Sequence, residues 1–372
     1  PAAVSAQDSD ALEPISIIGE SEDARQLPGS GYVVDSEQLD TEGTTDVHQA
    51  LKTVPGVYVR EEEGEGLRPN IGIRAANSGR SGKVTLMEDG VLIAPAPYSN
   101  PAAYYFPTVM RIDSIEVLKG APLLRHGPQT TGGVINLQST PIPEEETTYT
   151  EFVTDERGST DVHAWHGDSS GDWGWLVETV QRDGAGFKDI DRSNRDTGFE
   201  IEDYVGKLRW QGDRQSVRAK LQYSEQTSNA SYLGLTDDDF DSDPNRRYGL
   251  SSIDQMNTKH VGVDLRHVFE WTDRVQSTTM LYYNDFERNW FKLDDDGTTD
   301  ILNSAIGTSN ALTQANAQGV LDGTRDFQGL EYKNNNRAYD SSGVDVNFDI
   351  DLGAHQLETG FRYHEDEMDR FQ

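Results

Sequence analysis

The chain has 372 residues, which is enough for two or more domains, and its 65 acidic against 32 basic residues give a formal net charge of −33. This charge argues against general nucleic-acid binding, and the absence of cysteine excludes a disulfide framework and a thiolate metal site. No run of about 18 apolar residues occurs, so the sequence contains no transmembrane helix.

Residues 1–29 are acidic and are interrupted by Pro14, Pro28 and Gly29, so we expect a flexible extension. One apolar island stands out within it, Ile15-Ser16-Ile17-Ile18-Gly19. Taken alone, such an island is compatible with a stray edge strand.

The next expected elements are short. Residues 32–34 predict a strand, and residues 47–54 predict a helix that Thr44 or Thr45 caps and Pro55-Gly56 ends. An extended segment and an acidic loop follow at 57–59 and 61–66.

Four blocks between residues 71 and 136 combine extended runs with the Asp-Gly and Gly-Gly pairs of tight turns. They are Ile71-Gly72-Ile73-Arg74, Met87-Glu88-Asp89-Gly90-Val91, Ile115-Glu116-Val117-Leu118-Lys119-Gly120 and Gly132-Gly133-Val134-Ile135-Asn136. In this order, the blocks resemble the plug of TonB-dependent outer-membrane receptors. Arg125-His126-Gly127-Pro128-Gln129 and Ala96-Pro97-Tyr98 are further similar to the ferric-dicitrate receptor subgroup.

This resemblance implies a globular α+β plug at residues 30–143. It also implies that residues 144–372 are the first part of an antiparallel membrane β-barrel of the 22-stranded type. Within the extension, Ile15 to Gly19 resemble the TonB box, a segment that pairs as a strand with the TonB energy-coupling protein. Since about fourteen residues precede this segment, we expect no additional N-terminal signalling domain. The implied location is the outer membrane of a Gram-negative bacterium.

From residue 147 onward, apolar and polar residues alternate over long stretches, as at 217–224, 260–269, 344–351 and 356–363. Such alternation predicts barrel strands between lipid and a wet lumen. Short connections at 212–214, 270–273 and 352–353 alternate with long polar ones at 183–200, 227–256 and 294–334. This rhythm is typical of periplasmic turns and extracellular loops. Aromatic residues near strand ends suit interfacial girdles, namely Trp210, Trp271, Trp290 and Tyr363.

We expect about nine or ten barrel strands, whereas a plugged transporter has about 22. The sequence therefore predicts an N-terminal portion of a receptor. The alternative is a smaller barrel, which could hardly house a plug.

Two stretches of this acidic chain lack acids and carry cations, at residues 67–87 and 117–143. For Arg74 and Lys119 we predict ion pairs with acidic side chains on the barrel wall. Arg68 and Arg80 lie in polar loops, where wall pairing and contact with an anionic ligand are equally compatible with the sequence.

The loop at residues 94–107 is too rich in proline for a helix or a sheet. In related receptors the corresponding plug loop points outward and touches the ligand. Tyr98, Asn100 and Tyr104 offer hydroxyl, amide and aromatic groups for a metal chelate. The alternative is that these side chains pack the plug against the wall.

No nucleophile elbow, phosphate loop, dinucleotide fingerprint or histidine metal motif occurs, so we expect neither an enzyme nor a resident cofactor or metal. The run Asp237 to Asp243 resembles a calcium loop but lacks the glycine and glutamate of an EF-hand. A solvated acidic loop is expected there, with adventitious Ca²⁺ or cation bridges to lipopolysaccharide as alternatives. The run Asp294 to Asp296 is interpreted in the same way.

The resemblance implies a receptor that imports a ferric chelate, with ferric citrate or a similar siderophore as the leading cargo. Binding would change the exposure of residues 15–19, on which TonB would pull. Alternatives are another cargo, such as another siderophore, a zinc chelate or a cobalamin-like cofactor, and a surface adhesin that transports nothing. A secreted soluble β-rich binding protein is a further alternative.

Overall fold

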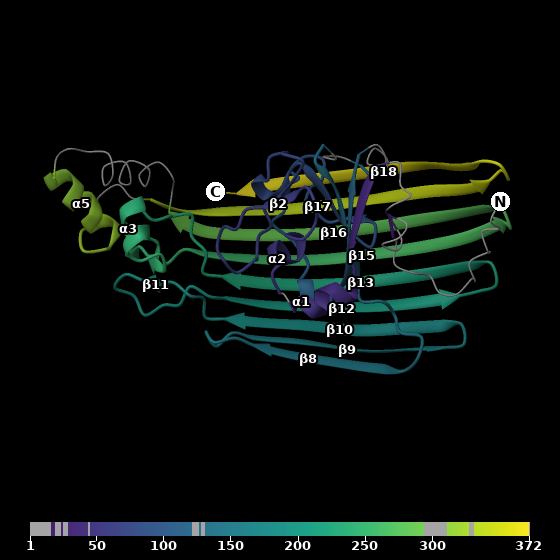
Figure 1. The fold of residues 1–372 in the computed structure, drawn as a ribbon, viewed down its shortest axis with the longest axis horizontal. Helices are drawn as coiled ribbons and strands as arrows, with labels where there is room; N and C mark the ends of the chain where they lie inside the picture. Colours follow the sequence, from purple (N-terminus) through teal and green to yellow (C-terminus); the bar gives the residue numbers. More distant parts are fainter. Residues whose placement is uncertain are drawn as a thin grey trace.

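The computed structural model of the chain describes residues 16–18, 24, 29–43, 45–120, 126–127, 131–293, 311–326 and 331–371. An N-terminal plug lies across the middle of a large sheet of long strands, and the plug strands cross those strands steeply (Figure 1). Among the described residues, no helix has the length and apolar character needed to cross a membrane.

The plug is built on a five-stranded mixed sheet with strand order β1-β6-β7-β4-β5. Strands β4 and β7 pair in parallel, and the other neighbours are antiparallel. Its strands are β1 (Ser30–Val34), β4 (Val84–Glu88), β5 (Val91–Leu92), β6 (Ile112–Lys119) and β7 (Gly133–Ser139). The remaining plug elements are α1 (Ser36–Glu42), α2 (Val47–Leu51), the hairpin β2 (Val57–Val59) and β3 (Ile71–Ile73), and the 3₁₀ turns η2 (Gly79–Ser81) and η3 (Val109–Arg111).

The predicted strand at residues 32–34 is confirmed as part of β1, but the predicted cap of the next helix was wrong. Asp46 caps α2 by accepting a hydrogen bond from the His48 N–H at 2.8 Å. The Thr45 hydroxyl instead accepts from Arg182 of the barrel wall at 3.1 Å, and Thr44 lies outside the described residues. The sequence analysis also missed α1, which Asp35 caps and which Gly43 ends in the left-handed conformation.

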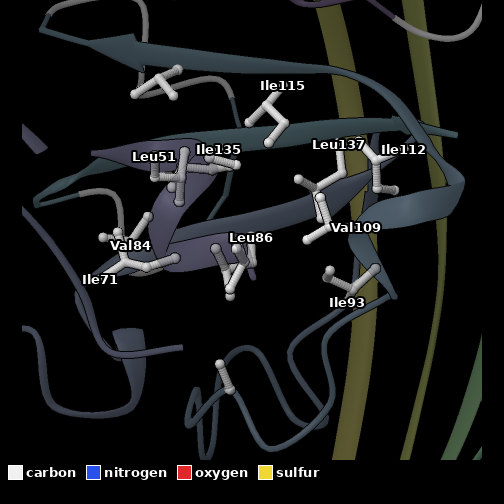
Figure 2. Packing of buried hydrophobic residues seen from close by; sticks show 14 of the residues in the cluster. Leu51, Ile71, Val84, Leu86, Ile93, Val109, Ile112, Ile115, Ile135 and Leu137 are labelled. Atoms are coloured by element: carbon white, nitrogen blue, oxygen red, sulfur yellow. The ribbon is translucent and has the colours of Figure 1, made fainter. Parts of the chain in front are cut away.

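The main apolar core lies on one face of the plug sheet, where side chains of β4, β6 and β7 meet α2 and the loops (Figure 2). Ile115, Val117, Ile135 and Leu137 are fully buried there. Because side chains alternate along a strand, the residues between them lie on the opposite face of the sheet. Those intervening residues include two polar ones, Glu116 and Asn136, which are directly opposite each other in the β6–β7 register.

The large sheet contains nine described strands, each antiparallel to its neighbours in sequence order, which confirms the predicted barrel fold. They are β8 (Thr147–Thr154), β9 (Thr160–Ser170), β10 (Trp173–Gly184), β12 (Phe199–Gln211), β13 (Gln215–Ser228), β15 (Gln255–Thr272), β16 (Val275–Leu293), β17 (Tyr332–Asp351) and β18 (Gln356–Phe371). The alternation is also confirmed, since Arg218 and Lys220 of β13 are buried against the plug while Leu221, the next residue along the strand, is 57% exposed.

Short turns gather at one end of the barrel strands and the longer connections at the other, here called the long-loop end (Figure 1). The longer connections contain β11 (Asp189–Ile190), α3 (Asp237–Ser242), β14 (Arg246–Arg247), η5 (Gly249–Ser251) and α5 (Ala311–Leu321). The expected acidic loop at residues 237–243 is therefore largely the helix α3, capped by Thr236, and residues 294–296 lie outside the described residues. The turn placed at 270–273 is shorter, because β15 continues to Thr272.

Buried ion pairs join the plug to the barrel wall at the Glu88-Asp89 turn. Arg111 bridges Glu88 at 2.6 Å and Asp203 of β12 at 2.7 Å. Lys220 of β13 contacts Glu88 at 3.0 Å and Asp89 at 2.8 Å. Burial raises the pKa of Glu88, but Arg111 and Lys220 outweigh it and lower that pKa to about 2. Both plug carboxyls are therefore charged at neutral pH.

We expect Arg111→Met to destabilise the protein by about 3–5 kcal/mol, because it leaves Glu88 and Asp203 with one fewer buried counter-charge. The measurement is the denaturant midpoint of the detergent-purified protein.

The matched control is Arg157→Met, since Arg157 is 45% exposed and pairs at 3.1 Å with Asp155 at the surface. Such surface pairs contribute little to stability. Equal midpoints for Arg111→Met and Arg157→Met would contradict a stabilising role for the buried pairs.

Candidate functional site

Cationic and aromatic side chains meet between the plug and the long-loop end of β16. We call this group the outer cluster. Its plug members are Arg68, Arg80 and Tyr104, and its other members are Tyr232, Arg288, Trp290 and Lys292. The last three are inward-facing residues of β16 just before its end at Leu293.

Each cation of the outer cluster lies over an aromatic ring. The Arg288 guanidinium carbon is 3.9 Å from the centre of the Tyr104 ring, and that of Arg80 is 5.2 Å from the same ring. Arg68 lies 5.6 Å from the Trp290 ring, and Lys292 Nζ lies 3.6 Å from the Tyr232 ring. An aromatic face attracts a guanidinium group stacked on it, but it does not accept hydrogen bonds from the N–H groups, which point outward in the guanidinium plane. The hydrogen-bonding capacity of the guanidinium edges is therefore left for other partners.

Several of these N–H groups are unused. Arg288 Nε, Nη1 and Nη2 form no hydrogen bond of good geometry among the described residues, and the same holds for Arg68 Nε and Arg80 Nη1; the acceptor near Arg288 and Arg80 is the Tyr104 hydroxyl. Arg68 and Arg288 are each 2% exposed. Buried donors without acceptors are costly and rare in folded proteins. This arrangement is suited to receive the oxygen atoms of an anion.

Among the described residues, one ion pair to a carboxylate is seen for the arginines of the outer cluster. Arg80 forms an ion pair with Glu62, and Arg68 donates a hydrogen bond to the Ser228 hydroxyl. Burial raises the pKa of the Tyr104 hydroxyl, but Arg288 and Arg80 outweigh burial and hold that pKa below its usual value. This lowered pKa reports a locally positive potential in a strongly acidic protein.

A cavity of about 430 Å³ adjoins the outer cluster on its β16–β17 side, and Arg288 and Arg337 both line it. Arg337 Nε has no hydrogen-bond partner among the described residues. Glu225, Lys259 and Glu287 also line this cavity.

The structure divides the five predicted ligand residues into two groups. Arg68, Arg80 and Tyr104 meet in the outer cluster, whereas Tyr98 and Asn100 contact β18 (Figure 1 shows this strand). The Tyr98 N–H donates to Asp366 at 2.7 Å, and Asn100 Nδ2 lies 3.1 Å from Met368 Sδ. For these two residues the geometry fits the alternative of packing the plug against the wall.

The predicted pairing of Arg74 and Lys119 with the barrel wall is not seen among the described residues, which include only nine wall strands. Lys119 Nζ donates to the Pro55 carbonyl inside the plug at 2.7 Å, and Arg74 is exposed. Among the described residues, neither forms an ion pair with a barrel residue. Arg111 takes that role, because η3 and β6 aim it into the wall beside Glu88.

The segment that resembles the TonB box is partly described. Ser16 is exposed, and Ile17 and Ile18 are buried against the plug sheet. Ile15 and Gly19 lie outside the described residues.

The sequence did not predict a place in the site for four members of the outer cluster, because only the tertiary fold brings them to the plug. They are Tyr232, Arg288, Trp290 and Lys292. Trp290 was assigned to an interfacial girdle, yet it is 1% exposed and faces inward beside Tyr232 at a ring distance of 4.2 Å. Arg288 and Lys292 follow the same period of two as Trp290. That spacing is the one signal in the sequence that groups these three residues on one face.

The model of the TonB-dependent receptor plug domain family matches residues 23–134. The vitamin B12 transporter BtuB of Vibrio vulnificus (strain YJ016) is 26% identical over 189 residues, which cover 49% of this chain and 29% of that transporter. The chain thus matches less than a third of this curated relative.

Solved structures of similar fold extend over nearly the whole chain. The unliganded ferric citrate transporter FecA superposes with a TM-score of 0.74 at 19% identity, over 97% of this chain and 51% of that one. The siderophore receptor PiuA from Acinetobacter baumannii gives 0.66 at 13% identity, over 92% and 46%. The chain therefore spans about half the length of these receptors. Residues 23–134 therefore match the plug domain of TonB-dependent receptors, and the chain as a whole has the fold of about half of such a receptor.

Proposed function

We propose that this chain is the N-terminal part of an outer-membrane receptor that imports an anionic ferric chelate, with ferric citrate as the first candidate. The chelate binds at the outer cluster, and TonB pulls on residues 15–19 to open a path. The observation that carries this proposal is the set of unused guanidinium N–H groups on Arg68, Arg80 and Arg288.

Charge distinguishes the competing cargoes. A carboxylate-rich chelate offers many oxygen acceptors, and each hydrogen bond from a charged donor contributes about 1.5–3 kcal/mol. The rings of Tyr104, Tyr232 and Trp290 add apolar surface for the body of the chelate. A neutral corrinoid would leave the guanidinium groups without counter-charge, so the outer cluster favours an anion over a cobalamin-like cargo.

We expect ferric citrate to quench the tryptophan fluorescence of the purified full-length receptor saturably, since Trp290 lies in the outer cluster. Arg288→Met should weaken this binding at least about tenfold to a hundredfold, because the loss of even one charged hydrogen bond costs about 1.5–3 kcal/mol. Iron-free citrate, a hydroxamate siderophore and cyanocobalamin are titrated in parallel.

The matched control for Arg288→Met is Arg214→Met, at the short-turn end of the barrel, where Arg214 pairs with Asp273 at 3.2 Å. This variant should bind as the unchanged receptor does. Saturation by cyanocobalamin alone would overturn the proposed cargo, and equal affinities of the Arg288 and Arg214 variants would overturn the proposed site.

Scrambling residues 15–19 should abolish uptake of radioactive ferric citrate by cells that carry this receptor as their sole route. Binding of ferric citrate to isolated membranes should be unchanged. The control scrambles the neighbouring residues 8–12. Uptake that survives the first change would overturn coupling through residues 15–19, whereas no uptake by cells with the unchanged receptor would favour a surface adhesin.

A further inference from the structure

Residues 16–18, which we call the coupling segment, cover the face of the plug sheet opposite the main core. Ile17 and Ile18 are 7% and 8% exposed and pack on Met87, Leu92, Leu118 and Val134. This apolar contact places the segment directly over the centre of the sheet, beside Glu116 and Asn136.

A single carboxylate holds the backbone of this segment. The N–H groups of Ile17 and Ile18 each donate to Glu116 at 2.9 Å, and the Ser16 hydroxyl donates to the same carboxylate at 2.5 Å. In an extended strand, successive N–H groups point to opposite sides. Two successive N–H groups on one carboxylate therefore require a bent backbone, so the segment must leave Glu116 before it can pair as a strand with a partner.

Asn136 connects this carboxylate to the ionic joint with the barrel wall. Its side-chain amide donates to Glu116 at 2.8 Å, and its side-chain carbonyl accepts from the Gly90 N–H at 3.0 Å. Gly90 follows Asp89, which accepts from Lys220 of β13 at 2.8 Å and from the Ser139 hydroxyl at 2.6 Å. Asn136 thus bridges the coupling segment and the Glu88-Asp89 turn.

The same turn is connected to the outer cluster. Glu88 accepts from Arg111 Nη1 at 2.6 Å, and Arg111 Nη2 donates to the Tyr105 hydroxyl at 3.2 Å. Tyr105 is the neighbour of Tyr104, on whose ring Arg288 stacks. These polar contacts, joined by the chain segments 88–90 and 104–105, therefore form a path from the outer cluster to residues 16–18.

We propose that Glu116 and Asn136 are positioning residues: Glu116 latches segment 16–18 in its bent form, and Asn136 transmits the state of the outer cluster to that latch. This inference rests on the proposed function and assigns its regulation to two residues. A ligand can open the latch only if it binds the open and latched states with different affinity.

The latch is tested in the full-length receptor with a single cysteine at position 17. These 372 residues contain no cysteine, and any cysteine elsewhere in the full-length receptor is first replaced by serine, so maleimide labelling of the Ile17→Cys background reports only the opening of this segment. Adding Glu116→Gln should raise the labelling rate about tenfold without any ligand. An unchanged rate would overturn the latch.

Transmission is tested by a double-mutant cycle in the same background. Tyr105→Phe keeps the ring but removes the hydroxyl that contacts Arg111, and we expect it to change the labelling rate about threefold. In the presence of Asn136→Leu, the same substitution should have no effect. Independent, multiplicative effects of the two substitutions would overturn transmission through Asn136.

The control is Ser81→Ala, which removes two buried hydrogen bonds of the plug away from this path, to the Ile71 N–H and the Pro69 carbonyl. It should leave the labelling rate unchanged. All variants must keep the denaturant midpoint of the background, and Asn136→Ala replaces Asn136→Leu if the latter does not fold. Both tests omit the ligand, so a failure of ferric citrate to bind would be seen separately, in the fluorescence titration.

Discussion

The ion pairs between the Glu88-Asp89 turn and the barrel wall fix the position of the plug. Arg218 and Lys220 approach this turn from β13, while Arg111 joins it to Asp203 of β12. All of these side chains are buried, so each charge depends on its partners for stabilisation. Removal of any one of these side chains leaves a buried charge without its counter-charge, which destabilises the folded protein.

These ion pairs also fix the position of the plug loop that reaches the outer cluster and of the sheet face that carries residues 16–18. On one side, Arg111 holds the loop that carries Tyr104 and Tyr105 against the wall, which brings Tyr104 to Arg288. On the other side, the turn places Asn136 beside Glu116 and the coupling segment. A rigid, hydrogen-bonded centre between two sites is a physical route by which the occupancy of one can change the other.

The distribution of charge is compatible with the proposed binding of an anion by an acidic protein. Most of the excess carboxylates lie on exposed surfaces and connections, whereas Arg68, Arg288 and Lys292 are buried at the contact between plug and barrel. A few cations in a site of low dielectric act more strongly on a bound ligand than many screened surface charges.

The sequence by itself determined the local elements and the general fold. Period-two alternation predicted the long barrel strands, because side-chain periodicity is a local property. The plug was predicted from the resemblance of the four blocks to the plug of TonB-dependent receptors. Long-range charge pairing was decided by the tertiary structure alone. Nothing in the sequence distinguishes Arg111 from Arg74 and Lys119, yet among the described residues Arg111 alone of the three pairs with a wall carboxylate. The sequence could not show this pair, because its partner Asp203 is 92 positions away. In the same way, only the register of β16 turned Arg288 and Trp290 inward toward Tyr104 and Arg68.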